Sequence, residues 1–161
     1  MRRNTDPAFV GIGVLKAKHG ETLAAFRAWA SAGEWTKIHR AHYDWWMFPM
    51  DEPSGYGFAY TVFEGDVVEL KNDAAYMNEY LEGASTLARA WGWSLADACP
   101  LSSTATGQAW QNWPIRLYKA TKSLKVFGCD EEYRSFRAYG QRLLAAGVSF
   151  EYSRDLTWLF N

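Results

Sequence analysis

Cysteine is scarce in this sequence. Only Cys99 and Cys129 occur, and they form no CxxC pair. A disulfide framework or a zinc finger needs more cysteines at closer spacing, so neither is expected. Disulfides belong to oxidising compartments, and the sequence is therefore typical of a reduced, cytoplasmic protein.

An excess of one charge is also lacking. The net charge is −1, and the basic residues are scattered along the chain. A nucleic-acid partner would require clustered Lys and Arg, so none is expected. No apolar run approaches the roughly 20 residues of a membrane span. The first residues also lack the apolar core of a signal peptide, and no membrane contact is expected.

Several catalytic motifs are missing. The chain has no G-x-S-x-G, no P-loop and no H-E-x-x-H, which disfavours serine hydrolases, P-loop NTPases and zinc proteases. Gly11 and Gly13 do not form a dinucleotide loop, because no third glycine follows at the required spacing. No cofactor is expected from these patterns.

Aromatic residues, by contrast, are abundant. They make up 17% of the 161 residues, with nine each of Trp, Tyr and Phe. A chain of this length is expected to form one domain over 1–161, of which residues 1–8 are an N-terminal tail. Large rings bury much area, so they predict a ring-rich core. Some of them could instead line a ligand-binding slot.

Helical periodicity dominates the rest of the chain. It predicts helices over 22–32, 36–47, 74–91 and 114–127, and a fifth one after Asp130. Residues 9–15 and 57–64 are apolar or alternating and are candidates for short strands. The predicted fold is mainly α: a single compact bundle of about five helices, with one or two short strands at most.

The stretch His39–Pro53 is the centre of this interpretation. In a helix over 36–47, His42 and Trp45 share a face with Ile38, and this face is expected to be buried. Arg40 and Asp44 are four residues apart on another face and could pair at the surface. Pro49 ends the helix.

The same stretch resembles the signature of the domain-of-unknown-function family 1810, which reads roughly K-x-x-H-W-M-W-F-I-F-P. Four residues fall on matching positions: His42, Trp45, Phe48 and Pro49. Weaker similarity continues through 60–81 and 119–127, so that about 23–145 is covered. The resemblance implies a compact, nearly all-helical fold, and it implies no particular activity.

The C-terminal part is similar to the NADAR group, which acts on N-glycosidic bonds of nucleotide or ADP-ribose derivatives. The group's pattern L-L-x-T-G, then E, then D-x-x-W-G is approached by residues 143–147, Glu151 and Asp155–Trp158. The gap from Glu151 to Asp155 is one residue short, and Leu159 replaces the final glycine. This resemblance implies that Glu151 and Asp155 are catalytic carboxylates.

Seven residues are therefore candidates for a site. The five expected to contact a ligand are His42, Trp45, Trp46, Arg116 and Lys119, and the two candidate catalytic acids are Glu151 and Asp155. Histidine titrates near neutrality, indoles stack on planar groups, and Arg or Lys can hold a phosphate. Each residue also has a structural alternative: a core histidine, packed rings or surface charges. His39 and His42 lack a third and fourth ligand nearby, so no metal site is predicted.

Three hypotheses follow. The chain could be a small-ligand-binding domain for nucleotide-like molecules, an N-glycosidic hydrolase, or a non-enzymatic interaction domain that forms a homodimer or binds another partner. A cavity that holds His42 and Lys119 would favour the first two, and a carboxylate in that cavity would favour the hydrolase. A filled core with an apolar surface patch would favour the third.

Overall fold

The chain is mainly α-helical in the computed structural model, which describes residues 1–161. The predicted fold class is confirmed, with seven helices in place of about five and two very short strands. The elements are α1 (Ile12–Ser31), α2 (Trp35–Arg40), α3 (Asp44–Met47), α4 (Glu64–Lys71), α5 (Ala74–Ala90), β1 (Trp93–Ser94), β2 (Cys99–Pro100), α6 (Pro114–Val126), α7 (Asp130–Ala145) and a final 3-10 turn η1 (Thr157–Leu159).

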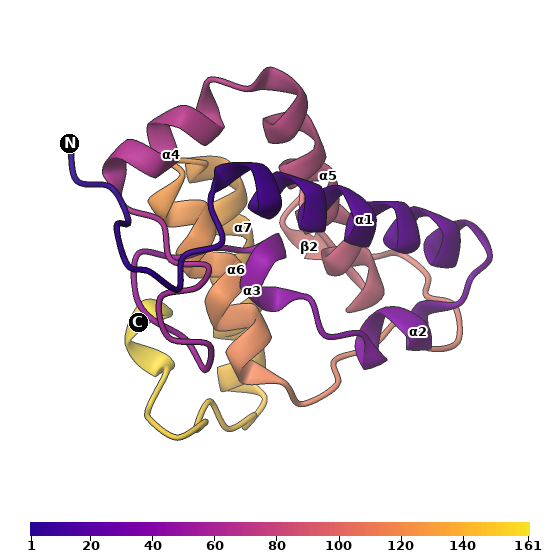
Figure 1. The fold of residues 1–161 in the computed structure, drawn as a ribbon. Coiled ribbons are helices and arrows are strands. Elements are labelled where there is room, and N and C mark those ends of the chain that lie inside the picture. Colours follow the sequence, from indigo (N-terminus) through magenta and orange to yellow (C-terminus); the bar gives the residue numbers. More distant parts are fainter.

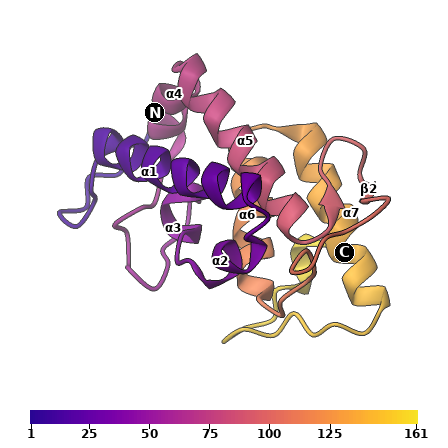
Figure 2. The ribbon, with the colours of Figure 1, turned by 90° about the vertical axis from the view of Figure 1, so that its right-hand side faces the viewer.

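Two pairs of helices form the body of the molecule. α6 packs along α7, and α1 packs along α5. α1 lies crosswise to the α6–α7 pair in two perpendicular views (Figures 1 and 2). The short α3 contacts both α1 and α6, so it lies between the two pairs. None of the helices combines the length and the apolar character that crossing a membrane requires.

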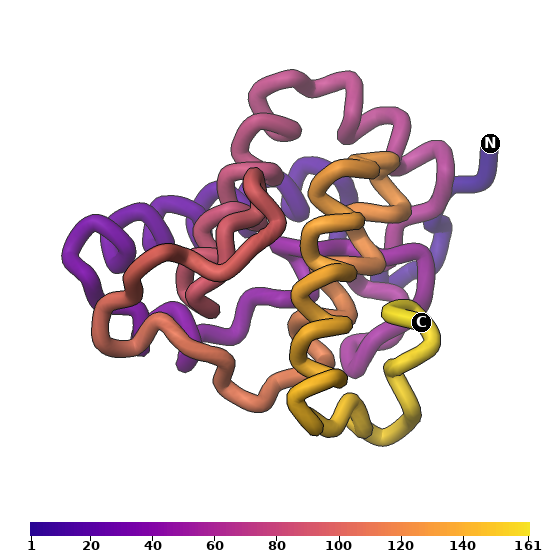
Figure 3. The backbone as a smooth tube through the Cα atoms, turned by 180° about the vertical axis from the view of Figure 1, so that it is seen from behind, coloured from indigo at the N-terminus to yellow at the C-terminus, as the bar shows by residue number.

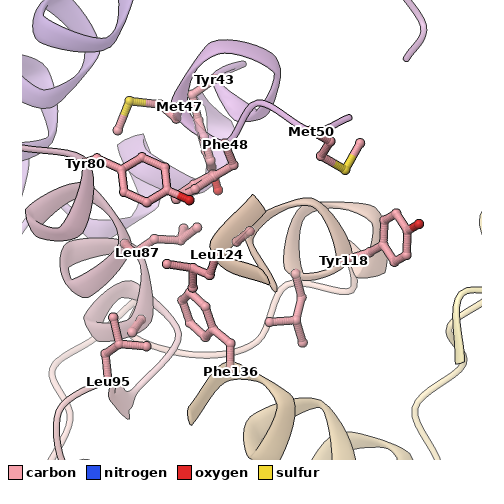
Figure 4. Packing of buried hydrophobic residues seen from close by; sticks show 14 of the residues in the cluster. Tyr43, Met47, Phe48, Met50, Tyr80, Leu87, Leu95, Tyr118, Leu124 and Phe136 are labelled. Atoms are coloured by element: carbon pink, nitrogen blue, oxygen red, sulfur yellow. The ribbon is translucent and has the colours of Figure 1, made fainter. Parts of the chain in front are cut away.

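The core is rich in rings, as predicted. Tyr80 of α5 stacks on Phe127 with 4.7 Å between ring centroids, and its hydroxyl hydrogen-bonds the Ser123 hydroxyl at 2.8 Å. The Tyr80 ring also meets Phe48, next to Leu124 of α6 (Figure 4). Aromatic side chains thus join α5, α6 and the end of α3 into one packed interior.

The predicted helix over 36–47 is wrong, because it is interrupted. α2 ends at Arg40, Ala41 is extended with ψ 150°, and α3 begins again at Asp44. The guanidinium of Arg116 donates to the carbonyl oxygens of His39 and Ala41, at 2.7 and 2.9 Å. The His39 carbonyl thus accepts from Arg116 and not from the amide of Tyr43, as a continuous helix would require.

The interruption changes which side chains face inward. His42 is exposed, whereas Tyr43 and Asp44 are buried. The predicted buried face containing His42 is therefore wrong, and so is the surface pair of Arg40 with Asp44.

The two stretches that were candidates for short strands form other structure. α1 begins at Ile12, so most of the 9–15 stretch lies in a helix of 20 residues that starts ten positions before the predicted one over 22–32. Residues 57–63 form turns and irregular backbone, with only an isolated bridge between Ser54 and Gly57. Short apolar runs do not distinguish a strand from a helix end, because both bury a few consecutive side chains.

Both ends of the chain are held against the body. The Asn4 side-chain amide donates to the carbonyls of Phe58 and Thr61 at 2.8 Å, and the Asn4 backbone amide donates to Asp66. Residues 1–8 are thus an anchored segment and not a free tail. At the other end, the segment after α7 folds back beside that helix (Figure 3), and Gln141 donates to the Phe160 carbonyl at 3.0 Å.

Candidate functional site

An open cleft of about 570 Å³ lies beside α3. Three parts of the chain line it: the stretch from His42 through the turn at 52–55, the start of α6, and the C-terminal loop 152–154. His42, Trp45, Arg116 and Lys119 are among the lining residues. The cleft therefore brings together four of the five residues that the sequence predicts as ligand contacts.

A buried ion pair forms the floor of the cleft. The Lys119 ammonium donates to Asp44 Oδ2 at 2.8 Å, and the two residues are 6% and 4% exposed. Asp44 is the first residue of the short α3. The ammonium also lies 4.6 Å from the centre of a Trp45 ring. Asp44 thus orients Lys119 beneath this indole.

Arg116 is committed to the protein framework. Besides its bonds to the carbonyls of His39 and Ala41, its Nε lies 3.9 Å from Asp44 Oδ1. These contacts fix the extended link between α2 and α3, and they place His42 at the cleft. Arg116 therefore shapes the site, with one donor from each terminal nitrogen held by a backbone carbonyl.

Aromatic rings stand on the cleft in two groups. Trp45 stacks with His42 at 6.4 Å and meets Tyr56 edge-on at 4.9 Å. Trp113, which precedes α6, lies 6.4 Å from Tyr152 of the C-terminal loop. Trp113 and Tyr152 are exposed, so part of each ring is open to a ligand, although the Arg116 guanidinium lies 5.2 Å from the centre of a Trp113 ring.

A second set of paired charges stands at the mouth. Glu52 accepts hydrogen bonds from the Tyr118 hydroxyl, at 3.1 and 3.2 Å, and from Arg154 Nη2 at 2.6 Å. Burial and the nearby Glu52 charge raise the pKa of Tyr118 to about 12, so its hydroxyl stays protonated and donates. The hydrogen bond to Glu52 raises the pKa of Arg154.

Three predicted residues lie away from the cleft. The Trp46 indole donates to Thr22 Oγ1 at 2.8 Å and packs against α1. Glu151 and Asp155 are exposed and joined by a backbone bridge, and the loop residues between them line the cleft instead. Hydrogen bonds from Thr157 lower the pKa of Asp155, which acts as a local turn residue.

Four residues of the site were missed by the sequence interpretation: Asp44, Glu52, Tyr118 and Arg154. The periodicity places Asp44 on a surface face, and Glu52 lies beyond Pro49, where the predicted helix has ended. Arg154 is 102 positions from its partner Glu52, so no local pattern joins them.

No group of three His, Cys, Asp or Glu side chains is arranged to hold a metal ion. His39, the other histidine of the central stretch, bonds the Gly107 carbonyl at 2.8 Å and does not line the cleft. The cleft therefore offers a ligand hydrogen-bonding side chains and aromatic rings on which to stack.

Comparisons with protein-family models, with curated proteins and with solved structures find no match to this chain. The resemblances to family 1810 and to the NADAR group accordingly stay predictions.

Proposed function

We propose that the protein binds a small ligand that joins a planar ring to an anionic group, with nucleotides as the leading class. One observation carries the proposal: an almost fully buried ammonium, Lys119, lies under the ring of Trp45 on the floor of an open cleft. An ammonium has three donors, and the only hydrogen bond of Lys119 goes to Asp44.

The size and lining of the cleft support the same proposal. Small-molecule sites are typically about 300–1,000 Å³, with apolar walls and a few convergent polar groups. Trp45 and Trp113 offer indole faces, and stacking of one base on an aromatic side chain contributes about 1–3 kcal/mol. The charged groups at the floor and mouth can then fix the orientation of the ligand.

The test is a thermal-shift titration with AMP, ADP-ribose and aromatic acids. A ligand present at about 100 times its Kd stabilises the native state by about 2.7 kcal/mol. For a domain of this size, this corresponds to a rise in Tm of about 5–10 °C. Lys119→Met is expected to remove the response. Lys125→Met, on the exposed side of the same helix, is expected to keep it.

Lys119→Met alone leaves Asp44 buried without its partner, which costs about 3–5 kcal/mol and could unfold the protein. The double variant Asp44→Asn/Lys119→Met removes both charges and is the better probe of binding. A folded double variant that binds as well as the native protein would overturn the role of Lys119. Absence of any response from the native protein would overturn the proposal itself.

N-glycosidic hydrolysis is the second candidate, because two carboxylates, Asp44 and Glu52, line the cleft. A carboxylate can activate the attacking water or stabilise the positive charge that develops on the sugar. The discriminating measurement is release of the free base from AMP or ADP-ribose, followed by chromatography. Hydrolysis that is lost in Glu52→Gln would support this candidate, whereas binding without turnover would reject it.

A further inference from the structure

We propose that Arg154 recognises the anionic group of the ligand, and that it does so by exchanging its partner Glu52 for that group. The inference rests on the proposed function and assigns a specificity-determining residue within the same cleft. The anionic group is a phosphate or a carboxylate, since both accept paired hydrogen bonds from a guanidinium.

The other two cations of the cleft are poorly suited to this exchange. Arg116 is held by two backbone carbonyls, and Lys119 is paired with Asp44. Both cations are buried, so a change of partner would leave a buried polar group unsatisfied. Arg116 and Lys119 therefore supply fixed positive charge. A hydrogen-bond donor that changes its partner when the ligand binds must be a different residue.

Arg154 has the required freedom. Its side chain is 52% exposed, and its only hydrogen bond goes to Glu52. A guanidinium has five N–H donors, so most of them are available to a ligand. Exposed ion pairs are weak, typically below about 1 kcal/mol, and an incoming anion can therefore displace Glu52 at small cost.

Glu52 remains supported after such an exchange. The Tyr118 hydroxyl donates to both of its carboxylate oxygens, at 3.1 and 3.2 Å. The Glu52 side chain is also 24% exposed and can be hydrated. Release of Arg154 thus leaves no bare buried charge behind.

The backbone presents Arg154 to the cleft. Ser153 adopts a left-handed conformation with φ 62°, and the Tyr152 amide donates to the Arg154 carbonyl at 3.0 Å. This tight turn places residues 152–154 on the cleft, whereas Glu151 and Asp155 stay outside. The exchange requires the Arg154 side chain to turn away from Glu52 and from the Tyr118 ring, whose centre lies 5.0 Å from the guanidinium carbon.

The experiment compares charged ligands with neutral counterparts by calorimetry. The pairs are AMP with adenosine, and indole-3-acetate with indole-3-acetamide, so that the phosphate and the carboxylate are tested separately. Arg154→Met is expected to weaken the charged member of a pair about tenfold, as loss of a hydrogen bond to a charged group does. The neutral member should change little. Arg134→Met, an exposed position on α7, is the matched control.

Glu52→Gln provides the sharper test, because its expected effect has the opposite sign. Glutamine still accepts from Tyr118 but no longer holds Arg154, so affinity for the charged ligand should rise about threefold. In the Arg154→Met background this gain should vanish. A gain that persists there would mean that Glu52 acts through its charge alone, and it would overturn the exchange.

The outcomes separate the two proposals. If the native protein binds neither pair, the proposed function fails. If it binds both members of a pair and Arg154→Met leaves their affinity ratio unchanged, the proposed function stands and the assignment of Arg154 fails.

Discussion

His19, one of two buried histidines, gives this protein a defined response to acid. His19 of α1 is fully buried, and neither ring nitrogen has a hydrogen-bond partner. Its ring lies 5.3 Å from that of Tyr76 and 6.4 Å from that of Tyr80. Burial lowers the pKa of His19 from 6.5 to about 4, and the charge of Glu82 offsets this only in part.

The sign of the pH dependence follows from this shift. The unfolded chain takes up the proton near pH 6.5 and the folded chain only near pH 4, so stability is lost as the pH falls through this window. The loss is on the order of 3 kcal/mol at pH 4. His19→Leu is expected to reduce the slope of the free energy of unfolding between pH 7 and 4, measured by urea denaturation. The remaining slope includes the contribution of His39, whose pKa is also lowered by burial. An unchanged slope in His19→Leu would contradict the assignment.

Residue types alone did not reveal this group. The central aromatic stretch drew attention to His39 and His42, whereas His19 sits in an ordinary helical sequence. Its burial results from the packing of α1 on α5, which joins residues distant in the chain. Long-range contacts of this kind also determine the partners of Asp44 and Arg154.

Among the elements, the helices with strong local signals were the most predictable. α5 and α6 match their predicted ranges within one residue. The Asp73 side chain caps α5 by accepting from the Tyr76 amide at 3.1 Å, and Pro114 stands at the start of α6. These signals are local, because capping and proline geometry depend on a few neighbouring residues.

The α2–α3 region was predictable only in part. Its helical tendency is visible in the sequence, but the interruption depends on Arg116, which bonds a carbonyl 77 positions away. The consequence reaches the site: a continuous helix would have buried His42, whereas the interrupted one leaves it at the cleft. Sequence periodicity therefore found the right segment and assigned the wrong face.

Two glycines in helices are expected to respond to alanine in opposite ways. At Gly140 of α7, an added Cβ would lie 2.3 Å from Cδ1 of the Phe160 ring, whereas at Gly20 of α1 nothing lies within 4 Å. Gly140→Ala should destabilise the protein by about 1–3 kcal/mol through overpacking. Gly20→Ala should stabilise it by up to about 1 kcal/mol through helix propensity. The denaturant midpoints of the two variants measure these changes in stability. Equal changes at Gly140 and Gly20 would contradict the close contact of α7 with the C-terminal segment.

On the scale of the whole molecule, one hydrophobic core receives residues from every helix. Asn4 and Gln141 tie the first and last segments to this body. A single contiguous core predicts that the whole chain unfolds in one cooperative step and that no part of it stays folded when the rest unfolds. The single core could be predicted from the composition, since a ring-rich chain of 161 residues can bury a substantial interior.

We therefore expect one thermal transition. Far-UV circular dichroism, which follows the helices, and near-UV circular dichroism, which follows the packed rings, should give coincident midpoints. A near-UV signal that disappears at a lower temperature would indicate that the aromatic core loosens before the helices melt, contrary to this expectation.

The placement of tryptophan has a practical consequence. Trp45 and Trp113 line the cleft, whereas Trp91 and Trp93 are sealed in the interior. A molecule that stacks in the cleft would quench the emission of the first two indoles and leave the interior ones as a constant background. The intrinsic fluorescence of the unlabelled protein can thus report binding in the cleft. The double variant Trp45→Phe/Trp113→Phe is the control when a compound library is screened.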